Sequence, residues 1–328
     1  MLHAHALAAA ATPHGTITMF QAVVLGIVQG VAELFPISSL GHTVLLPSLL
    51  GWNQVVSAQS DPESFWLAFV VALHVGNAVA LLAYFWRDWV EIIRAWLHTL
   101  VARRIETTTE RLAWLVVIAT IPAGIIGLAL EHPLRVALAH PIGAAIFLMV
   151  NGFILFGAER LRRRPLQATV GGPSAVAGRS VGGRRSAGSR PSVGNDVATQ
   201  RLDALTYPEA AWLGVAQSTA LIAGISREGV VMGAGLRAGL THENAARFSF
   251  LMATPIILAA GLVKIPDLLG PLGQGVRTQA LVGAVVAGVV SVLAIRFLLR
   301  FFRSNNLNPF GWYCLLAGLG MTIYLAVG

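Results

Sequence analysis

The sequence predicts an all-α protein that crosses a membrane about six times. Three observations lead to this fold class. Only 12% of the 328 residues are charged, the mean hydropathy is +0.70, and apolar stretches of roughly 20 residues, the length that crosses the hydrocarbon core as a helix, recur along the chain. Because a soluble domain carries about a quarter charged residues, the composition argues against soluble domains of this total length.

Six stretches are predicted to be full spans because each combines sufficient length with few charges. They cover residues 65–86, 112–130, 142–159, 246–265, 278–298 and 310–327. Two further apolar stretches, 19–51 and 207–240, are each interrupted by a break, FPISSLGH in the first and AGISREG in the second. A helix broken at membrane depth is tolerated only where its free backbone groups face protein or water. We therefore expect two re-entrant helix-loop-helix hairpins.

Arginine placement predicts how the spans are oriented, because positively charged loops stay in the cytoplasm. The segments 87–111, 160–206 and 296–303 are rich in arginine, whereas 52–64 and 131–141 carry little positive charge. With six spans, every loop reaches its expected side of the cell (plasma) membrane. The first hairpin then enters from outside and the second from the cytoplasm.

This opposite entry predicts an inverted-topology repeat, and the sequence contains one. GIVQGVAELFPISSLG (26–41) aligns without gaps with GVAQSTALIAGISREG (214–229). The matching residues are Gly26, Gln29, Ala32, Ile37, Ser38 and Gly41 with Gly214, Gln217, Ala220, Ile225, Ser226 and Gly229. Inverted repeats with broken helices usually place a site near the midplane, where the two halves meet. The predicted organisation comprises an N-terminal tail (1–18), a first membrane repeat (19–160), a basic loop (161–206) and a second membrane repeat (207–328).

The basic loop accounts for most of the net charge. Residues 162–201 hold eight arginines against one aspartate, which is seven of the eight net positive charges, and they are rich in Gly, Ser and Pro. This composition predicts a disordered segment on anionic lipid headgroups rather than a nucleic-acid-binding domain. The single cysteine, Cys314, excludes an intrachain disulfide and a cysteine-based metal site. The N-terminus lacks the positive region of a signal peptide, so we expect no cleavage.

The two breaks carry the ionisable and hydroxyl residues that could perform chemistry. They are Glu33, Ser38, Ser39 and His42 in the first hairpin, and Ser226, Arg227 and Glu228 in the second. Such residues at membrane depth are costly and indicate function. Arg227 offers a planar fork of donors for phosphate oxygens, and the helix after it adds N-terminal N–H groups. Ser39 or a water is the expected nucleophile, with His42 or Glu33 as base; His42 could instead bind a carbonyl.

Several of these residues also have a structural interpretation. Glu33 could pair with an arginine only to hold the hairpins together. We expect Ser38 and Ser226 to form hydrogen bonds with free backbone groups at the breaks rather than to take part in catalysis. His74 and Asn77, in the first span, are expected to be polar packing near the site rather than catalysts.

The motifs resemble the undecaprenyl-diphosphate phosphatase family, membrane enzymes of the bacitracin-resistance type. GIVQGVAELFPISSLGH is similar to the family's first signature, and AGISREGVV (223–231) to its second, a PGxSRSGxT pattern. ALHVGNAVALLAYFWRDW, IATIPAGIIGLAL and FSFLMATPIILAAGLVKIPDLL resemble later segments in the right order. The resemblance covers nearly the whole chain except the N-terminal tail and the basic loop.

The resemblance implies a set of site residues. The catalytic group would be Glu33, Ser39, His42 and Arg227, and the substrate-binding group Gln29, Ser38, Ser226 and Arg227. Three positions depart from the pattern: Ala223 replaces its proline, Glu228 a serine and Val231 a threonine. Glu228 would either compete with phosphate for Arg227 or join Glu33 in holding a divalent cation. The resemblance implies such a cation, and oxygen ligands suit Mg²⁺ or Ca²⁺.

Two functions of different classes follow. The first is a hydrolase that removes the terminal phosphate of undecaprenyl diphosphate, giving the monophosphate carrier for peptidoglycan synthesis, with a site open to the outside. The second is a polyprenyl-phosphate flippase or transporter of the same fold, in which Glu33, Arg227 and Glu228 only bind. The expected partners are the polyprenyl diphosphate lipid and membrane lipids, with a homodimer left open.

Overall fold

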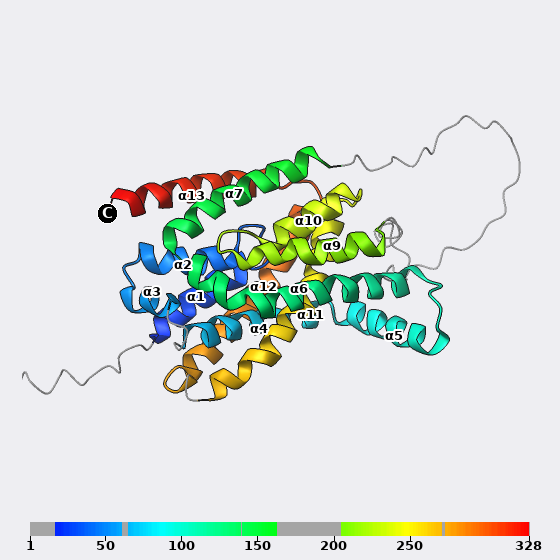
Figure 1. The fold of residues 1–328 in the computed structure, drawn as a ribbon, viewed down its shortest axis with the longest axis horizontal. Helices are drawn as coiled ribbons and strands as arrows, with labels where there is room; N and C mark the ends of the chain where they lie inside the picture. Colours follow the sequence, from blue (N-terminus) through cyan, green and yellow to red (C-terminus); the bar gives the residue numbers. More distant parts are fainter. Residues whose placement is uncertain (1–16, 61–64, 139, 163–204, 271–272, 328) are drawn as a thin grey trace, which may run out of the picture.

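A computed structural model describes residues 17–60, 65–138, 140–162, 205–270 and 273–327, and every regular element in these ranges is helical (Figure 1). The predictions for the N-terminal tail and the basic loop lie almost entirely outside the described residues. They stay predictions.

Six helices are long and apolar enough to cross a membrane. They are α4 (Trp66–Tyr84), α6 (Thr108–Leu138), α7 (Pro141–Arg160), α11 (His242–Leu269), α12 (Arg277–Phe301) and α13 (Asn308–Val327). Each contains most or all of one predicted span. The all-α class and the six spans are therefore confirmed.

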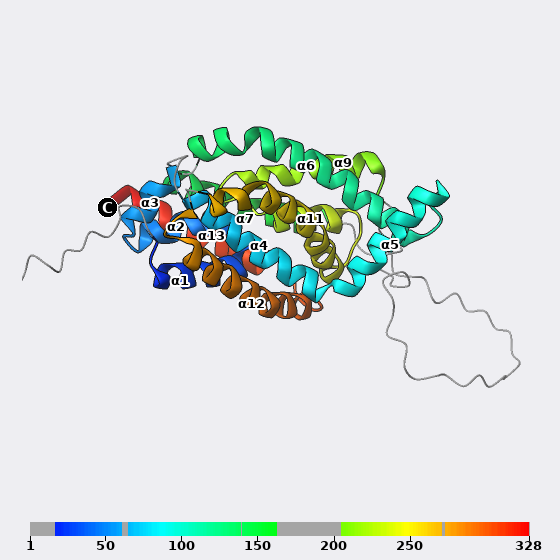
Figure 2. The same cartoon turned by 90° about the horizontal axis from the view of Figure 1, so that it is seen from below.

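Two further helices occupy connections to which the sequence assigned no structure. They are α3 (Asn53–Ser60) and α5 (Trp86–Ala102). α5 follows α4 after a break at Phe85 and packs against the start of α6, where Trp114 Nε1 donates to Thr99 Oγ1 at 2.9 Å. Figure 2 shows α5 at the end of the bundle away from α3. Both helices are peripheral to the site.

The two predicted hairpins each consist of two short helices around a break. The first contains α1 (Met19–Ala32) and α2 (Ser39–Leu49), and the second α9 (Tyr207–Gln217) and α10 (Arg227–Arg237), with a 3₁₀ turn at Ser218–Leu221. At 14 residues, α1 is only about 21 Å long, too short to cross the hydrocarbon core alone. This local structure suits re-entrant hairpins, whose depth in the membrane stays a prediction.

The first helix of each hairpin begins with a capping box, and the two boxes lie at equivalent positions of the repeat. Thr18 and Gln21 form a capping box at α1, and Thr206 and Glu209 form one at α9. In each box the threonine hydroxyl accepts a backbone N–H, and the glutamine or glutamate side chain accepts the threonine N–H. Both pairs have the register of the repeat, so the sequence repeat corresponds to a repeat in structure.

Glycines let both hairpins approach long helices closely. A Cβ at Gly26 of α1 would lie 2.6 Å from the Gly283 carbonyl oxygen of α12. A Cβ at Gly214 of α9 would lie 2.3 Å from the Ala119 carbonyl oxygen of α6. Real Cβ atoms do not approach an oxygen this closely, so both positions need glycine. The two hairpins are thereby fixed against α12 and α6.

The helix α7 packs against α13 and against one helix of each hairpin. It lies alongside α13 (Figure 1), and the two approach closely at small residues. A Cβ at Gly152 would lie 2.8 Å from the Gly311 oxygen, and one at Gly318 would lie 2.6 Å from the Ala145 oxygen. On its other face α7 packs against both α2 and α10, so it contacts both halves of the site.

Candidate active site

The breaks of the two hairpins meet, as the repeat predicted. The first helical residue after the first break is Ser39, and after the second it is Arg227. The Ser38 hydroxyl accepts the N–H of Gly224 at 3.1 Å, which joins one break directly to the other. This contact brings the polar residues of both hairpins into one cluster.

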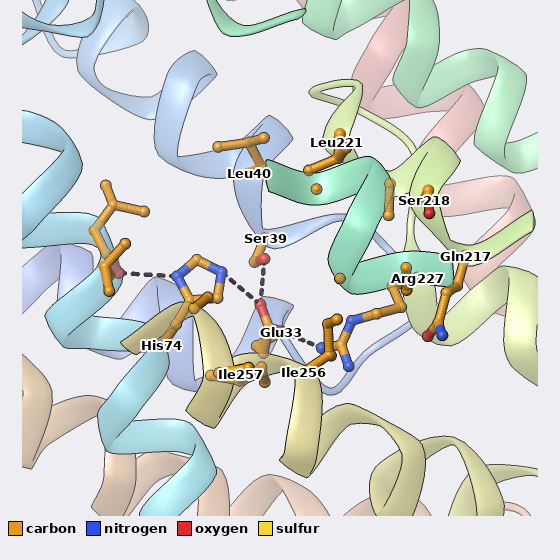
Figure 3. Close-up of a pocket in the computed structure, with 18 of the residues that line it drawn as sticks. Glu33, Ser39, Leu40, His74, Gln217, Ser218, Leu221, Arg227, Ile256 and Ile257 are labelled. Carbon is orange, nitrogen blue, oxygen red and sulfur yellow. Dashed lines mark hydrogen bonds and ion pairs between the residues drawn. The ribbon is translucent and has the colours of Figure 1, made fainter. Parts of the chain in front are cut away.

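Glu33 is buried at the centre of this cluster (Figure 3). Its Oε2 atom accepts from Ser39 Oγ at 2.5 Å and from Gln29 Nε2 at 3.0 Å, and His74 Nε2 lies 3.1 Å from the same oxygen. Its Oε1 atom accepts from Arg227 Nη2. One carboxylate therefore contacts a hydroxyl, an amide, an imidazole and a guanidinium.

His74 of α4 belongs to the site, although its sequence context suggested polar packing. Its Nδ1 atom lies 2.8 Å from the Val70 carbonyl oxygen, and its Nε2 atom faces Glu33. Since a neutral imidazole has a single N–H, it can donate to only one of these oxygens. The His74–Glu33 contact therefore needs an additional proton, on the ring or on the carboxyl. The pair can hold a proton next to Ser39.

Arg227 lies between two carboxylates. Its Nη2 atom contacts Glu33 and lies 2.9 Å from Glu228 Oε1, but that second contact lacks hydrogen-bond geometry. Within the described residues, Arg227 Nη1 and Glu228 Oε1 are both buried and without a hydrogen-bond partner. A buried donor without an acceptor is costly, and an anion next to Nη1 would satisfy it. The guanidinium thus has one nitrogen free to bind a phosphate oxygen.

The cluster forms the polar end of a cavity of about 330 Å³. Most of the rest of its wall is apolar and comes from α4, α6 and α11, and the remainder includes Gln217 and Ser218 of the second hairpin and Lys264 of α11. The apolar lining includes Leu67, Val70, Val71, Gly124, Gly127, Leu128, Ile256, Ala260 and Val263. A Cβ at Gly127 would meet no heavy atom within 4 Å, so this position leaves open space. Such a cavity fits an amphiphile with an anionic head and a long apolar chain.

The structure does not bring His42 into this cavity, contrary to the expectation of a shared pocket. The ring turns back onto its own helical turn, where Nδ1 lies 2.7 Å from the Ser38 carbonyl oxygen. Its Nε2 atom lies 2.8 Å from the Tyr313 hydroxyl, and the two rings stack. His42 thus supports the backbone just before Ser39, and this geometry matches its alternative interpretation, a bond to a carbonyl.

The other residues expected to bind substrate contact protein groups. Gln29 donates to Glu33, and Ser226 is fully buried, with its hydroxyl accepting the Gly229 N–H at 3.2 Å. Ser38 borders the cavity, but its hydroxyl accepts backbone N–H groups. For Ser38 and Ser226 this geometry matches the structural interpretation, in which serines satisfy free backbone groups at a break.

Two departures from the family pattern leave the cavity unchanged. Gly224 adopts a φ of +108° and makes the break that Ala223 could not make alone. Val231 is fully buried inside α10 and does not border the cavity. A threonine hydroxyl at position 231 would therefore not face a ligand. Glu228 is the departure that changes the site.

The residues do not fit a cation held by Glu33 and Glu228 as they are arranged. Arg227 Nη2 contacts both carboxylates and thus takes the position that the cation would need. Glu33 already accepts from its surrounding donors, and the described residues contain no group of three or more His, Cys, Asp or Glu side chains that could hold a metal. The expected Mg²⁺ or Ca²⁺ stays a prediction, and it requires Arg227 to move.

Known proteins match this chain over most of its length. The sequence profile described as Bacitracin resistance protein BacA matches residues 22–320. Undecaprenyl-diphosphatase 2 of Frankia alni is 50% identical over 95% of this chain and 99% of its own length. Undecaprenyl-diphosphatase of Mycolicibacterium paratuberculosis and that of Mycobacterium avium are each 48% identical, over 94% of this chain and 97% of their own length.

Proposed function

This chain belongs to the Bacitracin resistance protein BacA family, and from that premise we propose that it hydrolyses undecaprenyl diphosphate to undecaprenyl phosphate and inorganic phosphate. The product is the lipid carrier used in peptidoglycan synthesis. The observation that carries the proposal is the Ser39–Glu33–Arg227 cluster, in which the hydroxyl and the guanidinium contact opposite oxygens of one carboxylate. A nucleophile, a base and an anion-binding group thus lie together at the polar end of an apolar cavity.

The geometry supports a division of roles among the three residues. Ser39 Oγ transfers its proton to Glu33 Oε2, 2.5 Å away, and attacks the terminal phosphorus. Arg227 holds the phosphate oxygens through Nη1 and neutralises their charge, which is the main requirement of phosphoryl transfer. The bond to the bridging oxygen breaks, and its electron pair leaves with the lipid monophosphate. As the lipid monophosphate departs it takes the proton from Glu33. Water then attacks the phosphorus of the serine phosphate and gives a proton to Glu33, which passes it to Ser39 Oγ as the phosphorus–oxygen bond breaks and inorganic phosphate leaves.

His74 is proposed as the proton reservoir of this reaction. The proton that its contact with Glu33 requires lies next to the oxygen that receives the proton from Ser39. A pair that shares a proton can take up one proton and release one in each of the two steps. No step in this scheme uses a metal ion, because the carboxylates are engaged by Arg227.

The apolar wall supports a polyprenyl tail as the rest of the ligand. Leu67, Gly127 and Val263 lie near the ends of the predicted spans 65–86, 112–130 and 246–265 that the arginine placement predicts to be outside. We therefore propose that the cavity opens toward the outer side of the plasma membrane. The tail would follow the apolar wall while the diphosphate reaches Arg227.

The proposed activity is tested by phosphate release from undecaprenyl diphosphate by the purified full chain in detergent. We expect many turnovers per protein, whereas a transporter would bind the lipid stoichiometrically and release no phosphate. Farnesyl diphosphate, whose tail is shorter, should have a higher KM if the apolar wall contributes to binding.

The proposed orientation is tested by labelling intact cells with a membrane-impermeant maleimide in a Cys314→Ala background. His140→Cys, in a connection predicted to be outside, should react. Arg103→Cys, in a connection predicted to be cytoplasmic, should react only after lysis. The reverse pattern would contradict the orientation.

A further inference from the structure

One buried side chain outside the cavity contacts both hairpin breaks. Asn151 of α7 is fully buried, and its Nδ2 atom donates to the Pro36 carbonyl oxygen of the first break at 2.9 Å. Its Oδ1 atom accepts the Ser226 N–H of the second break at 2.9 Å. Nδ2 also lies 3.4 Å from Cys314 Sγ on α13. A single amide thus joins two segments that are 190 residues apart in the sequence.

The chemistry of the two contacts requires an amide in one orientation. The Pro36 oxygen can only accept, so it must face the NH₂ group, and the Ser226 N–H can only donate, so it must face the carbonyl. An aspartate would keep the second contact and lose the first. A leucine of similar volume would lose both and leave two buried backbone groups without partners.

The two bonds act at the residues that hold the proposed reacting groups. Pro36 lies within the six-residue break 33–38, which begins with Glu33 and ends just before Ser39. Ser226 is the residue before Arg227 and caps α10. The only direct hydrogen bond between the breaks besides the Arg227–Glu33 pair is the one from Gly224 to Ser38, among the described residues.

Ser38 gives a reason why the breaks need to be held. Its φ of +69° lies in the left-handed region that a non-glycine residue rarely adopts. Such strain persists only where the surroundings over-determine it. The hydroxyl of Ser38 binds Gly224 and Gly41, and Asn151 fixes Pro36 on the same segment. The conformation that places Ser39 next to Glu33 therefore depends on contacts across the two hairpins.

We infer that Asn151 is a positioning residue, which sets Ser39 and Glu33 of the first hairpin in register with Arg227 of the second without touching the substrate. This inference rests on the proposed phosphatase activity. Since a displacement of about 1 Å can cost roughly 10²-fold in rate, loss of the register should act on kcat. The apolar wall of the cavity is unaffected, so KM, which also depends on Arg227, should rise much less than kcat falls.

The inference is tested with full-chain Asn151→Leu and Asn151→Asp, assayed for phosphate release from undecaprenyl diphosphate across a pH range. Asn151→Leu should lower kcat by about 10²-fold at every pH, with KM within a few-fold. Asn151→Asp should be closest to wild type at low pH, because the protonated acid has an O–H that replaces the amide N–H toward Pro36. Its activity relative to wild type should fall as the pH rises and the acid ionises. Cys314→Ala, which removes the thiol that touches the amide, is the matched control and should keep its activity.

The outcomes separate the inference from the proposed function. If wild type releases no phosphate, the proposed function fails. If wild type turns over and Asn151→Leu keeps its kcat, or loses activity only in proportion to its folded fraction, the positioning role is wrong. An Asn151→Asp to wild-type ratio that is constant with pH would also overturn it, because a packing role does not depend on the proton of that acid.

Discussion

The two hairpins have the same construction and opposite chemistry. Ser38 caps α2 by accepting the Gly41 N–H, and Ser226, its equivalent, caps α10 by accepting the Gly229 N–H, each at 3.2 Å. Together with the capping boxes and the close-packing glycines, these caps show that aligned positions make the same local contacts. The repeat therefore provides two copies of one scaffold, a short helix, a break and a capped second helix.

The difference lies at the positions that face the shared cavity. Ser39 is the first residue of α2, and its equivalent Arg227 is the first residue of α10. Glu33 has no acidic counterpart, because the equivalent position is Leu221. The first hairpin thus provides a hydroxyl and the carboxylate that accepts from it, and the second provides the guanidinium, with Glu228 beside it. A duplicated scaffold can therefore bind and transform an anion once its two copies carry complementary groups.

The largest expected effect comes from removing the hydroxyl of the first hairpin. Ser39→Ala should lower kcat by at least about 10³-fold, because the proposed nucleophile is lost. Phosphate release measures the effect, with Ser48→Ala on the same helix as a control that should keep its activity. The Ser48 hydroxyl donates to the Val44 carbonyl oxygen of its own helix. Activity of Ser39→Ala near that of wild type would remove Ser39 from the reaction.

The second largest effect comes from changing the guanidinium of the second hairpin. Arg227→Lys keeps the charge, yet it should lose about 10²-fold in kcat/KM, because a point charge cannot bind Glu33 and a phosphate oxygen with separate nitrogens. Arg237→Lys, at the exposed end of the same helix, is the matched control. Equal turnover of the two variants would contradict the role of Arg227.

A third prediction tests whether the two scaffolds are equivalent. Gly26→Ala and Gly214→Ala should each destabilise the fold by about 1–3 kcal/mol, because the added methyl groups would overlap backbone oxygens of α12 and α6. Thermal unfolding in detergent measures this, with Gly157→Ala as control, since nothing lies within 4 Å of that position. If only one of the two glycines tolerates alanine, the hairpins are not packed in the same way.

The smallest expected effect concerns Glu228, whose equivalent in the first hairpin is Leu40. Glu228→Ser should lower KM by a few-fold, because Arg227 loses a carboxylate that competes with phosphate. Activity titrated with Mg²⁺ and with Ca²⁺ in both proteins decides between the two interpretations of this residue. Identical metal curves fit the competing carboxylate, whereas a weaker metal dependence with a lower kcat would assign Glu228 to a cation.

The sequence predicted the spans and the breaks because both depend on local patterns. Apolar length defined the six helices, and the Gly, Pro and Ser residues of the breaks defined the hairpins. The inverted repeat led to the expectation that Arg227 and Glu33 share one pocket, and the structure places their side chains in contact.

Contacts between distant helices could not be predicted in the same way. His42 lies three residues after Ser39 and was expected in the pocket, but Tyr313 and its own helical turn hold the ring elsewhere. His74 and Asn151 are each a polar residue within an apolar span, a pattern that signals a buried partner without identifying it. Their partners come from other helices, and only the packing of those helices identifies them.

In the proposed reaction the first hairpin performs the chemistry and the second binds the anion. The most direct measurement is the affinity of undecaprenyl diphosphate for Ser39→Ala, in which the lipid stays intact, and for the double variant Ser39→Ala, Arg227→Lys. We expect the single variant to bind with a Kd near the wild-type KM, and the double variant to bind at least about tenfold more weakly. Equal affinity in the two proteins would contradict the claim.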